Sequence, residues 1–165
     1  MSDDSVVRVL GPSDGEEGLL ASIGVRFMIS GEESGGGFCL VEHPMPARTL
    51  AAPLHRHNRE DEYSFVLEGR VGALLGDDVV YGVKGDLIIK PRGEWHTFWN
   101  AGDEPARILE IISPAGFERY FREMVALPPD ATTEDRLAIA ARYDLDSNPA
   151  SIPGLIEKYG LRWGR

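Results

Sequence analysis

Residues 85–100 read GDLIIKPRGEWHTFWN, and residues 55–69 read HRHNREDEYSFVLEG. Together these two stretches hold three of the four histidines of the chain. Each combines apolar residues that favour strands with glycines that favour turns. Successive side chains of a strand point to opposite faces, so His55 and His57, two residues apart, share one face and can bind one metal ion together.

Glu62 and His96 complete a candidate metal site. Glu62 supplies a hard oxygen ligand, and His96 comes from a distant strand, which a barrel allows because inward residues of non-sequential strands converge on its axis. Imidazole and carboxylate ligands suit iron, manganese, nickel, copper or zinc. Four protein ligands on an octahedral ion leave two positions open, so we expect one divalent transition metal per chain and room for chemistry beside it.

Short apolar runs separated by turn residues surround these stretches and predict an all-β barrel or sandwich. Gly76-Asp77-Asp78, between two such runs, predicts a hairpin turn. The runs that we expect to form strands are Val6 to Leu10, Leu19 to Ser30, Phe38 to His43, Glu62 to Leu67, Val71 to Leu75, Leu87 to Lys90, His96 to Asn100 and Arg107 to Ile112.

After Pro114 the pattern changes from strands to helices. Apolar residues from Phe117 to Val125 recur at i, i+3, i+4, i+7 and i+8, which predicts an amphipathic helix. Thr132 or Thr133 can cap a second helix, and we expect a third from about Ile152 to Tyr159.

The chain therefore divides into a barrel over residues 1–114 and a helical C-terminal extension over residues 115–165. The extension of roughly fifty residues buries too little apolar area to fold alone, so we expect it to pack on the barrel.

The two histidine-bearing stretches resemble the paired motifs of the cupin superfamily, which read G-x5-H-x-H-x(3,4)-E-x6-G and G-x5-P-x-G-x2-H-x3-N. The first motif fits from His55 to Gly69 but has Thr49 in place of its leading glycine, which ligates nothing. The second motif fits at every fixed position, which here are Gly85, Pro91, Gly93, His96 and Asn100.

The resemblance implies the cupin double-stranded β-helix, a jelly-roll barrel, in a small single-domain protein of the quercetin-dioxygenase-like kind. It assigns the metal to His55, His57, Glu62 and His96. Glu60 and Asp61 compete for the carboxylate role, but only Glu62 stands six residues before Gly69.

Other polar and aromatic residues near the motifs have simpler expected roles. His43 has no motif partner and precedes Pro44 at a strand end, so we expect it at the surface or the rim, outside the predicted metal site. Cys39 is expected to pack as a small hydrophobe. Trp95, Phe98 and Trp99 either line a pocket for a ligand or pack in the core, which is the commoner fate of such residues. The arginines Arg48, Arg56 and Arg59 either attract an anionic substrate or form a solvated surface, and we favour the surface.

Composition argues against nucleic acid and membranes as partners. The net charge of −10 repels nucleic acid, and no run of residues approaches the roughly 18 apolar residues of a membrane span. The acidic N-terminus lacks the features of a secretory signal, so we expect a cytoplasmic protein. The single cysteine excludes an internal disulfide.

We expect a metal-dependent dioxygenase-like oxidoreductase that acts on a small organic substrate, with Glu62 as the catalytic residue. The alternatives are a redox-neutral isomerase or lyase, in which Glu62 or Tyr63 moves a proton, and a non-catalytic module that binds or senses a small molecule.

Tyr63, Phe65 and Leu67 share a face away from the metal. Because this apolar face must be covered, we also expect a homodimer.

Overall fold

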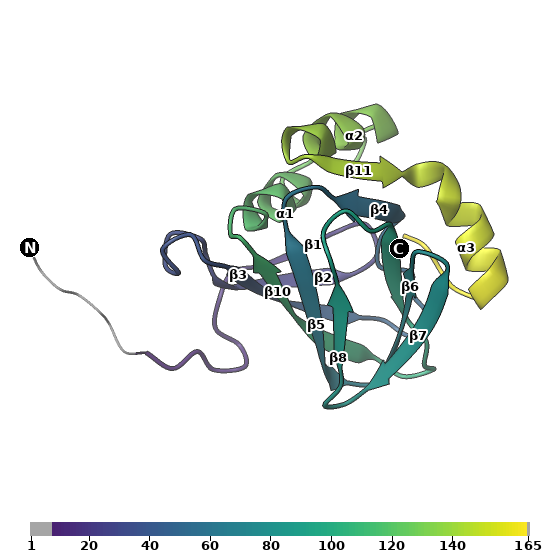
Figure 1. Ribbon diagram of the computed structural model, residues 1–165, viewed down its shortest axis with the longest axis horizontal. Coiled ribbons are helices and arrows are strands. Elements are labelled where there is room, and N and C mark those ends of the chain that lie inside the picture. The colour runs from purple at the N-terminus through teal and green to yellow at the C-terminus, as the bar shows by residue number, and fades with distance from the viewer. Residues whose placement is uncertain (1–7, 165) are drawn as a thin grey trace, which may run out of the picture.

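The computed structural model describes residues 8–164 and contains two antiparallel sheets that form a β-barrel (Figure 1). The six-stranded sheet has the order β1-β2-β3-β10-β5-β8, and the five-stranded sheet has the order β11-β4-β9-β6-β7. The strands of the first sheet are β1 (Glu17–Leu19), β2 (Gly24–Ile29), β3 (Cys39–Met45), β10 (Ala106–Ser113), β5 (Asp61–Glu68) and β8 (Leu87–Lys90). Those of the second are β11 (Leu145–Asn148), β4 (Leu54–His57), β9 (His96–Asn100), β6 (Arg70–Leu75) and β7 (Asp78–Val83). The all-β prediction and the C-terminal helices are confirmed.

The strand order brings the two histidine-bearing stretches together. Strand β4 pairs with β9, and their Cα partners are His55 and His96. Strand β5 pairs with β8, where Glu62 lies opposite Lys90. The barrel therefore places residues that are 41 and 28 positions apart in the sequence opposite each other in neighbouring strands.

Turn residues fix these pairings. Gly69 has a φ of +79°, and a Cβ on it would lie 2.6 Å from the Cβ of Ala106, so this position requires glycine. The N–H of Gly93, also at a φ of +79°, donates a hydrogen bond of 2.7 Å to the carbonyl of His57. The second motif is thus tied to the backbone of a residue of the candidate site.

The hairpin predicted at Gly76-Asp77-Asp78 joins β6 and β7 in register, with Leu75 opposite Asp78. The run from Leu19 to Ser30 is divided between β1 and β2, which pair with each other. The predicted strand from Val6 to Leu10 is wrong over residues 8–10, which form no strand, and residues 6–7 lie outside the described part of the chain.

The C-terminal extension contains the three predicted helices, α1 (Glu118–Val125), α2 (Thr133–Arg142) and α3 (Ile152–Tyr159), with a short 3-10 turn (Pro149–Ser151) before α3. Thr132 caps α2, because its hydroxyl accepts the N–H of Asp135 while the Asp135 carboxylate accepts the N–H of Thr132. The strand β11, which the sequence analysis did not predict, pairs with β4 through partners that include Leu145 and His57.

Figure 1 shows α1, α2 and β11 together at one end of the barrel, beside β4, whereas α3 runs along its side. Under α1, the aromatic rings of Phe117 and Phe121 pack against barrel residues such as Val41 and Ile112. Under α3, Leu155 packs with Leu50 and Trp99. Within residues 8–164 no helix has both the length and the apolar composition that crossing a membrane requires.

Candidate metal centre

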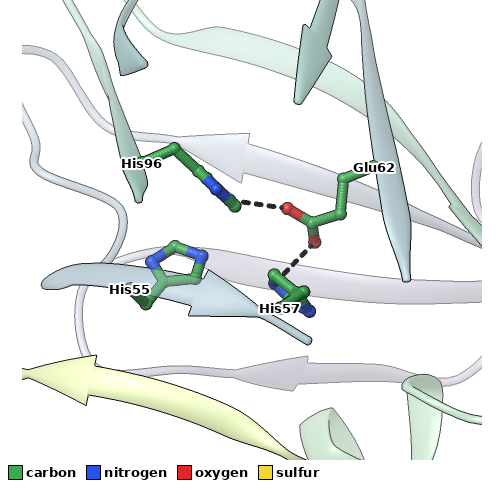
Figure 2. A group of neighbouring side chains, drawn as sticks. All are labelled: His55, His57, Glu62 and His96. Carbon is green, nitrogen blue, oxygen red and sulfur yellow. Dashed lines mark hydrogen bonds and ion pairs between the residues drawn. The ribbon is translucent and has the colours of Figure 1, made fainter. Parts of the chain in front are cut away.

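Four buried side chains from three strands converge inside the barrel (Figure 2). One potential ligand atom from each lies within 4.8 Å of those of the others, and none of the four residues exposes more than 7% of its surface. They are His55 and His57 on β4, Glu62 on β5 and His96 on β9. The structure therefore brings together all four predicted ligands in a cluster that could bind one metal ion.

The hydrogen bonds of the imidazoles orient the rings towards a common centre. Nδ1 of His55 donates to the carbonyl of Pro53 at 2.8 Å, and Nδ1 of His96 donates to the carbonyl of Glu94 at 3.1 Å. A carbonyl can only accept, so the proton of each neutral ring lies on Nδ1 and leaves a lone pair on Nε2. Nε2 with a lone pair is the form of histidine that binds a metal.

Nε2 of His96 lies 3.0 Å from Oε2 of Glu62, and Nε2 of His57 lies 3.3 Å from Oε1 of the same carboxylate (Figure 2). Two imidazole nitrogens thus face the two oxygens of one carboxylate in a buried space. A divalent cation between these atoms could be bound by all three side chains. The donor set and its orientation therefore fit a transition metal.

The neighbouring carboxylates are arranged differently. Glu60 is 4% exposed, and its Oε2, which accepts no hydrogen bond, lies 3.5 Å from Nδ1 of His57. Asp61 points outward and accepts hydrogen bonds from Arg92. Of the three competing carboxylates, Glu62 alone belongs to the cluster, and Glu60 stands behind one of its histidines.

A buried lysine adjoins the cluster and was missed by the sequence analysis. Nζ of Lys90 lies 3.2 Å from Oε2 of Glu62 and also binds Oε1 of Glu110, whose Oε2 accepts a hydrogen bond of 2.8 Å from the hydroxyl of Ser64. Burial acts to lower the pKa of Lys90, but the two carboxylates outweigh it and raise that pKa. The lysine is therefore charged at neutral pH.

The same contacts set the ionisation of the cluster. Burial acts to raise the pKa of Glu62, but the interactions with His57, Lys90 and His96 hold it well below the usual range. Burial, reinforced by the neighbouring His96 and His57, lowers the pKa of His55 well below its ordinary value. A carboxylate and a neutral imidazole are the protonation states in which these residues bind metals.

Part of the chain matches a known domain. Residues 42–112 match the sequence model described as "Cupin domain", and this range contains the whole cluster. The chain contains a cupin domain. None of the curated proteins compared with it matches in sequence.

Solved structures share the cupin barrel. A sugar phosphate isomerase from a cupin superfamily, from Silicibacter pomeroyi, is 20% identical, with a TM-score of 0.56 over 64% of this chain and 75% of that one. A predicted oxalate decarboxylase from Thermotoga maritima is 22% identical, with a TM-score of 0.53 over 56% and 80%. Pac13 from Streptomyces, a nucleoside dehydratase solved with uridine, is 15% identical, with a TM-score of 0.51 over 63% and 78%. At these identities the likeness shows the fold alone.

Three residues of the cluster, His55, His57 and Glu62, line a cavity of about 90 Å³. Phe117, just before α1, and Tyr120, Phe121 and Met124 of α1 line this cavity, so the C-terminal extension forms part of its wall. The other lining residues come from the barrel, β11 and the chain ends, and are Leu20, Ala21, Ile23, His43, Ala51, Ala52, Pro53, Phe98, Glu110, Leu145, Ser147 and Trp163.

The remaining residues singled out in the sequence are distributed around the cupin barrel. Of the three motif aromatics, Phe98 lines the cavity, whereas Trp99 stacks on Tyr159 outside it. Asn100 closes its strand by donating to the carbonyls of Met45, Pro46 and Glu104. The three arginines near the first motif form ion pairs away from the cavity, namely Arg48 with Asp103, Arg56 with Asp146 and Arg59 with Asp144.

His43 is the residue whose position the sequence analysis missed. It has no motif partner, yet its ring is 2% exposed and lines the same cavity as the cluster. Cys39 is buried as expected, and burial raises the pKa of its thiol, so it packs as a protonated apolar group.

Proposed function

We propose that this cupin is a metal-dependent enzyme in which His55, His57, Glu62 and His96 hold one divalent ion. The observation that supports the proposal is the convergence of three imidazoles and one carboxylate within 4.8 Å of one another at the wall of a cavity. Four protein ligands leave two positions of an octahedral ion for the oxygen atoms of a substrate.

The cavity lining indicates the substrate class. Most lining residues are apolar or aromatic, and in the described part of the chain no lysine or arginine is among them. Phosphate groups are bound by such cations, so this lining argues against a phosphorylated substrate. The lining favours a small, largely apolar molecule whose oxygen atoms reach the metal position, such as a phenol, an enol or a diketone.

The reaction that we favour is oxygenation of this molecule. The chain's own contribution is to bury the apolar part of the substrate against Phe98, Phe117 and Phe121 and to exclude water from the reacting end. When bound, the ion supplies one-electron chemistry towards dioxygen if it is iron, manganese or copper, and polarises a carbonyl if it is zinc or nickel.

A redox-neutral isomerase or lyase is the second candidate, and a specific observation favours it. Glu110 and His43 place two ionisable side chains on the cavity wall, beside the metal cluster. Such groups can hold or move a proton during an isomerisation or elimination, with no need for dioxygen.

Oxygen consumption separates these candidates. Protein purified without an affinity tag is assayed for oxygen uptake with catechol and with acetylacetone, each in air and under argon. Uptake that requires the protein and disappears in His55→Gln supports the oxygenase. Product formed equally well under argon supports the isomerase or lyase, and ligand binding with no product in either gas indicates a binding module.

Arg59→Gln provides the matched control. Arg59 lies in the same motif, but its side chain is 59% exposed and forms an ion pair with Asp144 at 3.9 Å. This variant is expected to keep wild-type oxygen uptake. Equal loss in Arg59→Gln and His55→Gln would contradict the ligand assignment.

A further inference from the structure

The fourth histidine of the chain lies in the cavity without belonging to the metal cluster. His43 is on β3, and its inward-facing ring is 2% exposed. The ring centroid lies 5.2 Å from that of Phe121 and 6.5 Å from that of Phe98, and both aromatic residues also line the cavity. His43 is therefore a polar group within the apolar part of the cavity wall.

One nitrogen of His43 is fixed by the neighbouring strand. Nδ1 lies 2.8 Å from the carbonyl oxygen of Gly24 on β2. Because a carbonyl only accepts, Nδ1 carries the proton, and a neutral ring then has its lone pair on Nε2. Burial lowers the pKa of His43 even though the charge of Glu110 opposes this effect, which keeps the ring neutral.

The other nitrogen has no partner within the protein. No group of residues 8–164 forms a hydrogen bond with Nε2 of His43. Glu110, which also lines the cavity, is different, because both of its carboxylate oxygens are occupied, one by Lys90 and one by Ser64. Nε2 is not among the fully buried polar atoms that lack a partner, so it reaches the open space of the cavity, where a hydrogen-bond donor of a ligand can approach it.

We propose that Nε2 of His43 accepts a hydrogen bond from a hydroxyl group of the substrate. This proposal rests on the proposed function and narrows its substrate class, since a phenol or an enol carries the required donor whereas an ether or a diketone in its keto form does not. The ring is held by Gly24 before the substrate arrives, so little rotational freedom is lost when the hydrogen bond forms.

The test uses phenol and toluene, which have nearly the same shape and differ in the hydroxyl donor. Both are titrated into metal-free protein, prepared with a chelator, and binding is measured by calorimetry. Metal-free protein is used because a metal ion would bind the phenol oxygen itself. The cavity lining includes the half-buried residues Leu20, Tyr120, Met124 and Trp163.

The quantity compared is the ratio of the two dissociation constants, which cancels the effect of a variant on apolar packing. His43→Leu is expected to lower the preference for phenol over toluene by about 5- to 10-fold, the effect of one lost hydrogen bond. His43→Gln, which keeps an acceptor near the position of Nε2, is expected to recover part of the preference. An unchanged preference in His43→Leu would overturn the proposal, as would the absence of saturable phenol binding in the wild type.

A second measurement needs no variant. In protein labelled with nitrogen-15 at histidine, the Nε2 resonance of His43 is expected to shift when phenol is added and to stay in place with toluene. Equal responses to both probes would overturn the proposal even if His43→Leu fails to fold. Metal content is measured separately, so a wild-type protein that binds no metal would refute the proposed enzyme while a selective response to phenol would still support the role of His43.

Discussion

Nζ of Lys90 lies 3.2 Å from Oε2 of Glu62, and both side chains are buried inside the barrel. The same ammonium group binds Glu110, so one cation balances two buried carboxylates. Removing one partner from a buried ion pair leaves an uncompensated charge.

Lys90→Met is therefore expected to lower the free energy of unfolding of the metal-free protein by about 3–5 kcal/mol. Urea unfolding at pH 7 measures this change. The double variant Lys90→Met/Glu110→Gln removes one of the two carboxylate charges that Lys90 balances. It is expected to recover part of the lost free energy of unfolding. A single variant within about 1 kcal/mol of the wild type would show that the lysine does not balance these charges.

Glu60→Gln tests the carboxylate behind His57. Oε2 of Glu60 lies 3.5 Å from Nδ1 of His57, where it can orient the ring and strengthen it as a ligand. We expect the variant to bind the metal about 10- to 100-fold more weakly, as measured by competition with a chelator. Asp61→Asn is the matched control, because that carboxylate binds Arg92 outside the cluster. If both variants bind the metal as tightly as the wild type does, Glu60 does not contribute to metal binding.

The interior of the barrel could be predicted only in part from the sequence. The four predicted ligands could be located because their spacing places His55 and His57 on one face, and because the resemblance to the cupin motifs points to Glu62 and His96. The burial of Lys90 could not be predicted, because the run Leu87-Ile88-Ile89-Lys90 does not show which face of the strand is inward. In the structure Leu87 and Ile89 are exposed while Lys90 is buried, the reverse of the usual pattern.

His43 and β11 were missed for a related reason. The burial of His43 depends on the pairing of β3 with β2 and β10, and the segment Leu145–Asn148 becomes a strand through its pairing with β4. Both are long-range pairings that leave no local pattern. The helices of the extension, in contrast, follow local rules of spacing and capping, and α3 begins and ends at the predicted residues.

The pH dependence of stability can be tested at Glu42, which is distant from the metal cluster in sequence and is 7% exposed. Burial acts to raise its pKa, but hydrogen bonds from Arg26 and Arg107 outweigh burial and lower it. A carboxyl with a lower pKa in the folded state stabilises the protein above the unfolded pKa of about 4.3, and the stabilisation is lost as the pH falls through the folded pKa.

Glu42→Gln is therefore expected to be less stable than the wild type at pH 7, with a difference that shrinks as the pH falls below about 4. Urea unfolding of metal-free protein at several pH values measures this difference. A difference that stays constant, or grows, as the pH falls would contradict the ion-pair account of Glu42.

We propose that the outer face of β5 and β8 pairs with a second copy of this chain. Leu87 and Ile89 are 50% and 56% exposed on the edge strand β8, and they lie opposite Phe65 and Tyr63 on β5. An apolar face along an unpaired sheet edge favours association. We expect a dimer by sedimentation velocity, and Ile89→Lys is expected to convert it to a monomer that keeps its metal.

Leu137→Lys is the matched control for this prediction, because Leu137 is also exposed but lies on α2. It is expected to remain dimeric. A monomeric wild-type protein would contradict the proposed dimer. A dimer that persists in Ile89→Lys would show that the interface does not lie on the outer face of β5 and β8.

The most direct test of the account is elemental analysis of untagged protein by inductively coupled plasma mass spectrometry, with wild type and His96→Ala prepared side by side. The wild type is expected to contain about one transition metal ion per chain, and the variant less than about a tenth of that with its circular dichroism spectrum retained. Wild-type protein that binds no metal even after anaerobic reconstitution, or a His96→Ala variant that is fully loaded, would contradict the four-ligand metal site.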